Sequence, residues 1–360
     1  MQKISYEIKE RIEPVTFAEH LGFCQYFTDH CFEMDYSPEK GWHNASIKPL
    51  QNLSLHPATM FIHYGQAIFE GLKAFKTVNE EIVSFRPDRH FTRLNNSARR
   101  LCMPEVDIDF VIHAMSELIK VDKNWIPTGP GESLYLRPFM FGDDSVLGVK
   151  PSTNYKFLII MSPVGAYYPE GFKPVKILAQ DDYVRAVRKG IGECKTPANY
   201  AASLYAAEVA KDKGFTQVLW LDGVEQKYIE EVGTMNIFIH FKDEIATPKL
   251  TGSILPGVTR ASVIEILQSW NMKVTERLIS IQEVIDEYKK GNVLGVFGTG
   301  TAAIISVLGL LQYKDFDMNF TYADDCLEAK LFNYIVSLDF GKSEDVHNWL
   351  TIIEKNGVTV

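Results

Sequence analysis

IEEVGTMNIF, at residues 229–238, is the stretch that decides how this chain folds and works, together with GECKTPANY at residues 192–200. The first stretch places Glu231 at the start of a strand-like run, and the second places Lys195 in a loop that begins with a glycine. A lysine can form an imine with an aldehyde cofactor, and a carboxylate can keep a ring nitrogen protonated. These are the protein's parts in pyridoxal phosphate chemistry, where the cofactor is the electron sink. The two stretches therefore raise the hypothesis of a pyridoxal phosphate enzyme.

Length and composition favour an ordinary globular protein with two domains. The chain has 360 residues, of which 46% are hydrophobic and 23% charged. A net charge of −9 argues against nucleic acid or an anionic membrane as a partner. The first residues lack an apolar signal region, and no apolar run reaches the length of a membrane span, so we expect a cytoplasmic protein. The five scattered cysteines include no C-x-x-C pair, so neither disulfides nor a metal site is expected.

Hydrophobic periodicity predicts helices and strands in both halves of the chain. Before about residue 55 the sequence looks irregular and rich in aromatic residues. We expect helices at residues 89–101, 108–121 and 199–213, a helix after the capping box SIQE at 280–283, and strands at 133–141, 155–162, 175–180, 217–222, 236–241 and 293–298.

The order of these elements indicates the fold class. Strands and helices are mixed without strict alternation, and no G-x-G-x-x-G or Walker sequence follows a strand. We therefore expect α/β or α+β domains built on a mixed sheet or barrel, and not a dinucleotide-binding fold. The stretch at 164–174 is rich in glycine and proline and suggests a linker. The predicted division is a small domain at 1–167, a linker at 168–176, and a large domain at 177–360 that carries the lysine.

Each candidate residue also has an ordinary structural interpretation. A single loop lysine is more often a surface lysine than a cofactor attachment point. Glu231 can equally be a solvated carboxylate at a strand edge, and Glu230 competes with it by position. Arg93 can be a solvent-facing helix residue. Arg137 lies in the apolar run LYLRPF at 134–139, which suggests a carboxylate partner.

Two glycine-containing turns are suited to a phosphate. SILPGVTR at 253–260 leads into a predicted helix, and FGTGTAA at 297–303 follows a predicted strand. Backbone N–H groups without partners at such turns attract anions. Similar turns are also common as simple connections between helices and strands. The aromatic stretch FIHYGQAIFEG at 61–71 fits either a core or an apolar substrate pocket.

Taken together, the motifs resemble those of the branched-chain amino-acid aminotransferases, which are fold-type IV pyridoxal phosphate enzymes. Nine motifs match in order along the chain. They are HYG (63–65), FEGLKAF (69–75), RL-x-x-SA (93–98), LYLRP (134–138), GAY (165–167), K-x-x-x-NY (195–200), EVGTMNIF (231–238), LPGV (255–258) and GTA (300–302). The resemblance implies a fold-type IV architecture with two domains and the active site at their interface.

The resemblance also implies roles for particular residues. Lys195 would be the Schiff-base lysine and the proton carrier, Glu231 the partner of the pyridine nitrogen, and Tyr200 the partner of the phenolic oxygen. The remaining residues implied around pyridoxal 5'-phosphate are Arg93, Val258, Thr259 and Thr301 at the phosphate, Leu255 against the ring, and Arg185 close by.

The implied substrate pocket contains Tyr64, Phe69, Tyr135, Tyr167 and Thr234. The backbone of Thr301 and Ala302 would bind the α-carboxylate. Arg137 would orient Tyr64 and admit the second carboxylate of glutamate. Leu147 and Val149 would reach the pocket of a neighbouring subunit, which implies a homodimer.

Three departures from the family pattern stand out. The lysine is followed by Thr196, Pro197 and Ala198, where the family usually has an apolar residue or threonine and then glycines, so proline constrains this loop. Ala303 and Ser306 replace a redox cysteine pair. Glu230 stands where threonine is common.

The implied reaction is transfer of the amino group from L-leucine, L-isoleucine or L-valine to 2-oxoglutarate, as in branched-chain amino acid biosynthesis. The alternatives are another fold-type IV enzyme, such as a D-amino-acid or (R)-amine aminotransferase or aminodeoxychorismate lyase, and a pyridoxal-phosphate-binding homeostasis protein with little turnover.

Overall fold

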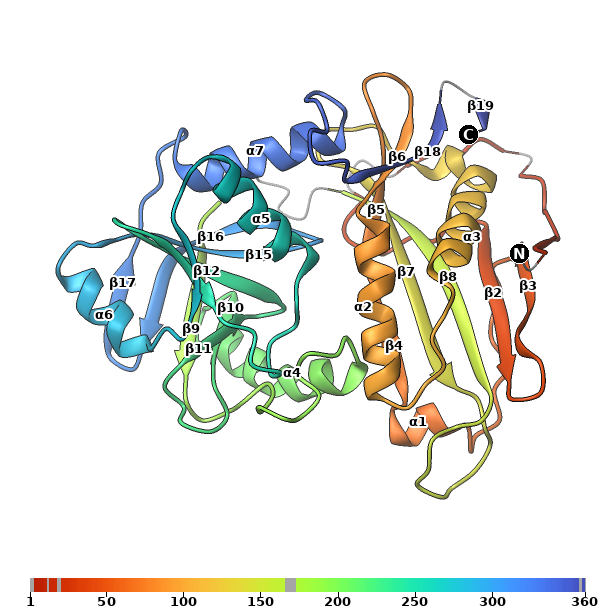
Figure 1. The fold of residues 1–360 in the computed structure, drawn as a ribbon, viewed down its shortest axis with the longest axis horizontal. Helices are drawn as coiled ribbons and strands as arrows, with labels where there is room; N and C mark the ends of the chain where they lie inside the picture. The colour runs from red at the N-terminus through yellow and green to blue at the C-terminus, as the bar shows by residue number, and fades with distance from the viewer. Residues whose placement is uncertain (1–2, 12, 18–20, 166–172, 356–357, 360) are drawn as a thin grey trace. The chain divides into compact units, whose positions relative to one another are not determined.

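The computed structural model describes the chain apart from residues 1–2, 12, 18–20, 166–172, 356–357 and 360 (Figure 1). It forms two compact units. The first comprises Met1–Pro169, Cys194–Pro197 and Val336–Val360, and the second comprises Glu170–Glu193 and Ala198–Ile335.

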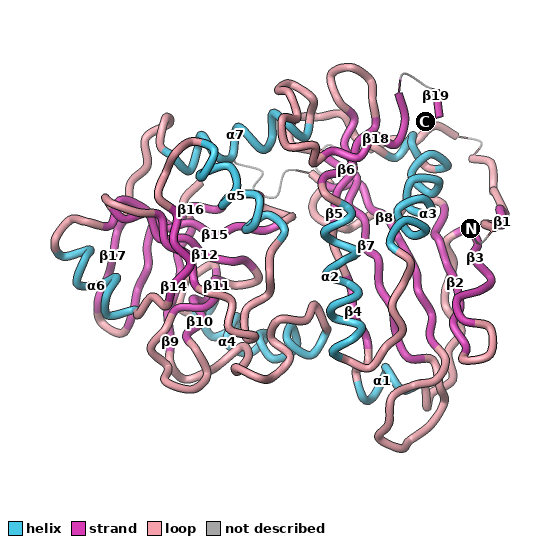
Figure 2. The backbone as a smooth tube through the Cα atoms, viewed as in Figure 1, coloured by secondary structure: helices cyan, strands magenta, loops and turns pink. Residues whose placement is uncertain are grey.

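A mixed, mostly antiparallel sheet forms the centre of the first unit (Figure 2). Its strands run in the order β1 (Ser5–Tyr6), β3 (Gly41–Pro49), β2 (His30–Ser37), β8 (Tyr155–Val164), β7 (Ser133–Gly142), β5 (Leu72–Lys76), β6 (Ile82–Phe85), β18 (Leu350–Lys355) and β19 (Val358–Thr359), and β4 (Ala67–Phe69) pairs with β7.

Two helices, α2 (Pro87–Arg100) and α3 (Ile108–Val121), pack on this sheet and on each other. On α2, Phe91, Leu94 and Ala98 are fully buried at helical spacing, as the periodicity predicts. These helices share one hydrophobic cluster with Phe32 and Phe157 of the sheet. Short α1 (Met60–Tyr64) and the 3-10 turn η1 (Lys123–Trp125) complete the unit.

The second unit is a closed barrel with added strands. Strands β11 (Ile229–Val232), β10 (Gln217–Leu221), β9 (Val175–Gln180), β16 (Ile304–Tyr313), β15 (Val293–Gly300) and β12 (Met235–Phe241) pair in that order, and a β11–β12 pairing closes the ring. The barrel is extended by β13 (Ile245–Pro248), β14 (Val274–Arg277) and β17 (Phe316–Asn319). The helices are α5 (Val258–Ser269), α6 (Ile281–Lys289), α4 (Pro197–Asp212) apart from its first residue, and α7 (Leu327–Asp339) as far as Ile335.

The mixed α/β class and most predicted elements are confirmed. Ser280 caps α6 by accepting from the Glu283 amide at 3.0 Å, as the capping box predicts. Gly214 follows α4 with φ of +81°, a conformation that suits a helix end.

The prediction of irregular structure before residue 55 is wrong, because β2 and β3 form a hairpin there. Buried Phe32 and Met34 alternate on β2 with Glu33 and Asp35, whose carboxylates pair with Lys156. This period-2 alternation was the available signal.

The predicted domain boundaries stay a prediction. Spatial proximity groups two segments of the chain differently from the predicted division. Residues 336–360 group with the first unit because they supply β18, which pairs with β6. Cys194–Pro197, including the lysine, also group with the first unit, because their backbone hydrogen-bonds to it. Part of the predicted linker, 168–172, lies outside the described residues.

Candidate active site

Lys195 is held in the first unit by hydrogen bonds on both sides of its α-carbon. Its amide donates to Ser97 Oγ on α2 at 3.0 Å, and its carbonyl accepts from the Phe69 amide at 3.0 Å. Thr196, fully buried, donates from Oγ1 to the Ala67 carbonyl at 2.8 Å. The side chain of Lys195 is partly buried, with Nζ 5.1 Å from the centre of the Phe69 ring. The local structure therefore aims this lysine from a fixed backbone, unlike an ordinary surface-loop lysine.

Pro197 is compatible with this loop because it is the first residue of α4. At that position a helix needs no N–H donor, and the fixed φ of proline suits the helix start. The departure from the usual glycines thus has a local physical explanation.

Arg93 is buried and paired with Glu70, so its interpretation as a solvent-facing residue is wrong. Its Nε and Nη2 donate to the two oxygens of the fully buried Glu70, each at 2.8 Å. His90 Nδ1 lies 3.0 Å from the same carboxylate. Burial raises the pKa of Glu70, but Arg93 and His90 outweigh it and hold that pKa well below its usual range. Glu70 and His90 fix the direction of the Arg93 guanidinium. Sequence reasoning gave neither a role, although Glu70 lies within the FEGLKAF motif.

Arg137, Tyr135 and Phe69 form an aromatic cluster around one cation. Arg137 Nη2 donates to the Tyr135 hydroxyl at 3.0 Å, and its guanidinium carbon lies 4.8 Å from the centre of the Phe69 ring. A Cβ added to Gly71 would come within 1.9 Å of the Tyr135 hydroxyl, so only glycine leaves room for this tyrosine. Arg137 Nε is buried and has no hydrogen-bond partner among the described residues.

The predicted contact from Arg137 to Tyr64 is not observed. The Tyr64 hydroxyl instead donates to the Leu147 carbonyl at 2.6 Å. Arg137 contacts Tyr135 because residues two apart on β7 point to the same face of the sheet. Leu147 and Val149 are 74% and 85% exposed, which is unusual for apolar side chains.

In the second unit Glu231 is buried, which excludes the solvated-carboxylate interpretation. Its Oε1 accepts from the Leu255 amide at 2.6 Å, and its Oε2 lies 3.1 Å from Arg185 Nε. Arg185 is itself buried, and its Nη2 donates to the carbonyls of Gly192 and Ser253. Glu230 is buried as well and accepts a hydrogen bond from Ser253 Oγ, so burial alone does not separate the two glutamates.

The start of α5 suits a phosphate group. Gly257 precedes this twelve-residue helix, and no side chain caps its first amides within the described residues. A Cβ on Gly257 would come within 1.9 Å of Asn236 Oδ1, and Asn236 Nδ2 donates to the Leu255 carbonyl at 2.8 Å. The turn is therefore built tightly around a glycine that leaves the helix amides uncovered.

A second feature of this unit also fits an anion. In β15, the buried Thr299 hydroxyl has no hydrogen-bond partner among the described residues. Thr301 and Ala302 follow at the turn into β16. Uncapped helix amides and a spare buried hydroxyl are donors that a phosphate accepts. The donor set present thus fits the phosphate of pyridoxal phosphate.

The structure brings the predicted residues together in two sets. The first unit groups Lys195, Phe69, Tyr135 and Arg137, with Arg93 on the helix that anchors the lysine. The second unit groups Glu231, Arg185 and Leu255, with Val258 and Thr259 opening α5. Tyr200 is partly buried on α4, Thr234 is exposed in the turn between β11 and β12, and Tyr167 lies outside the described residues. The predicted placement of the site at the domain interface stays a prediction.

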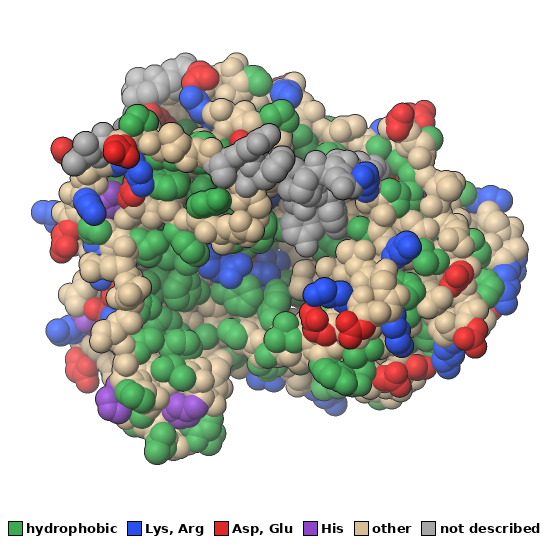
Figure 3. Space-filling model, turned by 180° about the vertical axis from the view of Figure 1, so that it is seen from behind, with side chains coloured by type: hydrophobic (Ala, Val, Ile, Leu, Met, Phe, Trp, Pro, Cys, Tyr) green, Lys and Arg blue, Asp and Glu red, His purple; other side chains and the backbone are tan. Residues whose placement is uncertain are grey.

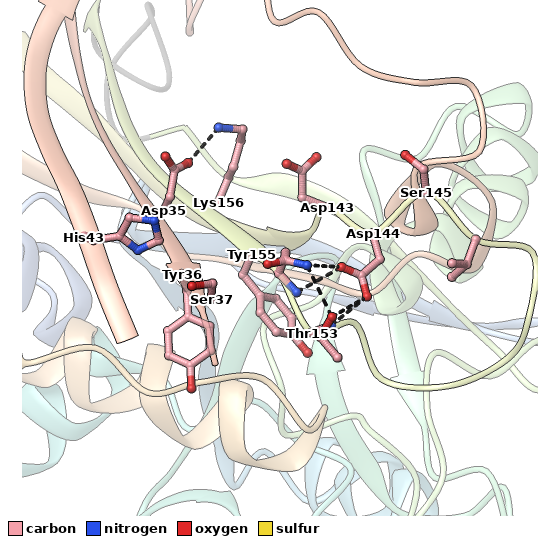
Figure 4. Close-up of a pocket in the computed structure, with 12 residues that line it drawn as sticks. Asp35, Tyr36, Ser37, His43, Asp143, Asp144, Ser145, Thr153, Tyr155 and Lys156 are labelled. Atoms are coloured by element: carbon pink, nitrogen blue, oxygen red, sulfur yellow. Dashed lines mark hydrogen bonds and ion pairs between the residues drawn. The ribbon is translucent and has the colours of Figure 1, made fainter. Parts of the chain in front are cut away.

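A separate cavity in the first unit, of about 560 Å³, contains none of the predicted site residues (Figure 4). It is lined by Asp35, His43, Asp143 and Lys156 among others. The Asp144 carboxylate accepts hydrogen bonds from Thr153 and Asn154 there, as in an ordinary polar loop.

Over the described residues, no helix is long and apolar enough to cross a membrane, and no group of three or more His, Cys, Asp or Glu is placed to hold a metal ion. On the face drawn in Figure 3, acidic and basic side chains are interspersed.

Comparison with known proteins places this fold and site in a family. The family model for amino-transferase class IV matches residues 67–306. Branched-chain-amino-acid aminotransferase 2 of Bacillus subtilis is 48% identical over 351 residues, which is 97% of each chain. A branched-chain-amino-acid aminotransferase of Mycolicibacterium smegmatis is 41% identical over 337 residues, or 91% of each chain.

Solved structures show the same fold. The branched-chain amino acid aminotransferase from Thermobaculum terrenum, in its pyridoxal phosphate holo-form, superposes with a TM-score of 0.73 at 21% identity, covering 92% of this chain and 100% of the other. The branched-chain amino acid aminotransferase from Escherichia coli superposes with a TM-score of 0.73 at 23% identity, covering 91% of this chain and 99% of the other. The family match and these relatives define a pyridoxal-phosphate-dependent transaminase. This chain belongs to the class IV aminotransferase family.

Proposed function

We propose that this chain is a branched-chain-amino-acid aminotransferase. It transfers the amino group of L-leucine, L-isoleucine or L-valine to 2-oxoglutarate, giving branched 2-oxo acids and L-glutamate. The observation that carries the proposal is that relatives with this name are 41–48% identical to the chain over nearly its whole length. The aromatic cluster around Arg137 is consistent with it, because it offers apolar walls and one cation.

The bound cofactor supplies an aldehyde and an electron sink. Lys195 provides the amine that attaches it and then moves the proton of the substrate's α-carbon. The two backbone hydrogen bonds of Lys195 support this role, because a proton carrier acts over a short distance and must be aimed.

Glu231 keeps the proton on the ring nitrogen of the cofactor. A buried carboxylate makes a strong charge-assisted hydrogen bond, and Leu255 and Arg185 hold this one in place. Tyr200 would hydrogen-bond the phenolic oxygen of the cofactor, and Leu255 would contact its ring. The phosphate would be held by Arg93, Val258, Thr259 and Thr301.

The substrate pocket must accept an apolar side chain in one half-reaction and a carboxylate in the other. Phe69 and Tyr135 contribute apolar walls, together with Tyr64, Tyr167 and Thr234. The buried Arg137 Nε, which has no hydrogen-bond partner in the described part of the chain, is a donor for the second carboxylate of glutamate. The backbone of Thr301 and Ala302 binds the α-carboxylate.

The enzyme acts as a homodimer in the cytoplasm. The exposed apolar side chains of Leu147 and Val149 support a subunit contact in the loop after β7. Burial in a second subunit removes this apolar surface from water.

A donor panel tests the proposal. The purified protein, loaded with pyridoxal phosphate, is offered L-isoleucine, L-leucine, L-valine and D-alanine with 2-oxoglutarate, and glutamate is measured. Glutamate from the three L-amino acids is expected. A preference for D-alanine would favour a D-amino-acid aminotransferase, and cofactor binding without turnover would favour a homeostasis protein. In a separate incubation with aminodeoxychorismate, release of pyruvate would favour the lyase.

A further inference from the structure

Glu230 lies at an irregularity in β11 that changes the direction of its side chain. Trp220 pairs with Glu231, but the next residue, Leu221, pairs with Ile229, so Glu230 is the extra residue of a β-bulge. In a regular strand, neighbouring side chains point to opposite faces. A bulge re-aims one of them. Both Glu230 and Glu231 therefore contact the segment at 253–255, through Ser253 and Leu255.

A chain of contacts joins the two glutamates. Ser253 Oγ donates to Glu230 Oε1, and the Ser253 carbonyl accepts from Arg185 Nη2. Arg185 Nε lies 3.1 Å from Glu231 Oε2, close enough for an ion pair, although that N–H makes no hydrogen bond within the described residues. Within the described residues, the Arg185 guanidinium thus lies at ion-pair distance from Glu231 alone, is hydrogen-bonded to backbone carbonyls, and is linked to Glu230 through Ser253.

The second oxygen of Glu230 has unmet hydrogen-bonding capacity. Glu230 is 4% exposed, and its Oε2 is buried without a hydrogen-bond partner among the residues that the structure describes. An ionised carboxylate in this state is costly. A protonated carboxyl carries no charge, so its burial costs less.

The charges around Glu230 come from several elements. Glu231 is its neighbour on β11, Asp222 follows β10, and Arg185 and Arg188 lie in the segment before Lys195. Burial raises the pKa of Glu230 to about 6, Ser253 and Arg185 oppose this, and the charges of Glu231 and Asp222 add to it. Glu230 therefore changes charge in a range where enzymes are commonly assayed.

We propose that Glu230 is a positioning residue: its ionised carboxylate, linked to Arg185 through Ser253, adds negative charge beside the Glu231–Arg185 pair and so sets how strongly Glu231 holds the proton on the cofactor's ring nitrogen. The inference rests on the proposed role of Glu231. With Glu230 neutral, Arg185 neutralises Glu231. With Glu230 charged, the charge around Glu231 is more negative, which favours a proton on the ring nitrogen.

The first test uses the apoprotein and needs no turnover. A carboxyl group whose folded pKa is raised contributes stability that is present below its unfolded pKa of 4.5 and is lost as the pH rises through about 6. Relative to Glu230→Gln, the melting temperature of the wild type should fall by about 4 °C between about pH 4.5 and about pH 7.5.

Two further variants sharpen this test. Ser253→Ala removes the hydroxyl that donates to the Glu230 carboxylate. The pH-dependent fall in melting temperature should therefore occur at higher pH in this variant. Glu208→Gln removes an exposed carboxylate of α4 and should leave the pH profile of the wild type unchanged. A pH-independent difference between wild type and Glu230→Gln would mean that Glu230 does not titrate, which overturns the inference.

The second test measures coupling to the ring nitrogen. The dissociation constant of pyridoxal phosphate is compared between wild type and Glu230→Gln from about pH 5 to about pH 7.5. The wild type should gain affinity relative to the variant by about three- to tenfold over this range, because a coupling of one pKa unit corresponds to tenfold.

A cofactor analogue supplies the control, with C–H in place of the ring nitrogen. With this analogue the ratio of dissociation constants should stay constant with pH. If the ratio is constant with pyridoxal phosphate as well, or varies equally with the analogue, Glu230 does not act through the ring nitrogen and the inference fails. If wild type does not bind pyridoxal phosphate at all, the proposed function fails too, which distinguishes the two outcomes.

Discussion

Replacing Glu70 by glutamine should cost this protein a large part of its stability. The wild-type carboxylate is fully buried and accepts both a bidentate pair from Arg93 and a contact from His90. Glutamine keeps the shape but removes the charge, so the buried guanidinium loses its counter-ion. Breaking a buried pair in this way costs about 3–5 kcal/mol. Because the amide oxygen of glutamine can still accept one hydrogen bond, we expect the lower end, about 3 kcal/mol.

The same helix offers a matched control. Arg99 donates from Nε and Nη2 to the two oxygens of Glu105, each at 2.9 Å, and both side chains are largely exposed. The geometry is the same as that of the buried pair, but water screens the charges. Glu105→Gln should therefore cost only about 0.5 kcal/mol.

The assay is thermal and urea unfolding of both variants against wild type, in parallel. For a unit of about 200 residues, the loss from Glu70→Gln corresponds to a fall of about 6–12 °C in melting temperature. The folded pKa of Glu70 is lowered, so its contribution is present above the unfolded pKa of 4.5 and is lost as the pH falls further. The difference in unfolding free energy between wild type and Glu70→Gln should become smaller only below pH 4.5. Equal losses in Glu70→Gln and Glu105→Gln would refute the argument from burial.

Three other predictions concern the site itself. Lys195→Ala should lose the visible absorbance of the bound cofactor and its turnover; retention of that absorbance would show that another group attaches the cofactor. Glu231→Gln should lower kcat at least about a hundredfold, whereas Glu230→Gln should keep most activity near neutral pH, and the reverse ranking in steady-state kinetics would overturn the assignment. Gly71→Ala places a Cβ 1.9 Å from the Tyr135 hydroxyl. The variant should therefore lose about 1–3 kcal/mol of stability in urea unfolding, and its KM for isoleucine should rise. Unchanged stability and KM would mean that Tyr135 moves freely.

The sequence alone led to the family and to the chemistry of the site. Motifs such as EVGTMNIF and K-x-x-x-NY hold chemical groups at fixed short spacings, and such spacings can be read without coordinates. The helices and most strands followed from periodicity, because a local pattern of apolar residues reflects a local geometry. The β2–β3 hairpin departs from the predicted irregular structure, although its apolar and acidic residues alternate along β2 in the period-2 pattern of a strand.

Tertiary structure decided what depends on residues distant in the sequence. The Glu70–Arg93–His90 cluster exists because a strand end meets helix residues that lie 20 and 23 positions later in the chain. Burial of Glu230 beside Glu231 depends on a bulge, which arises only when β11 pairs with β10. The contact of Arg137 with Tyr135 depends on the face of β7 to which both point. A sequence states which groups are present and how they are spaced along the chain. Their charge state and partners follow from desolvation and pairing, and both depend on what the folded chain brings next to them.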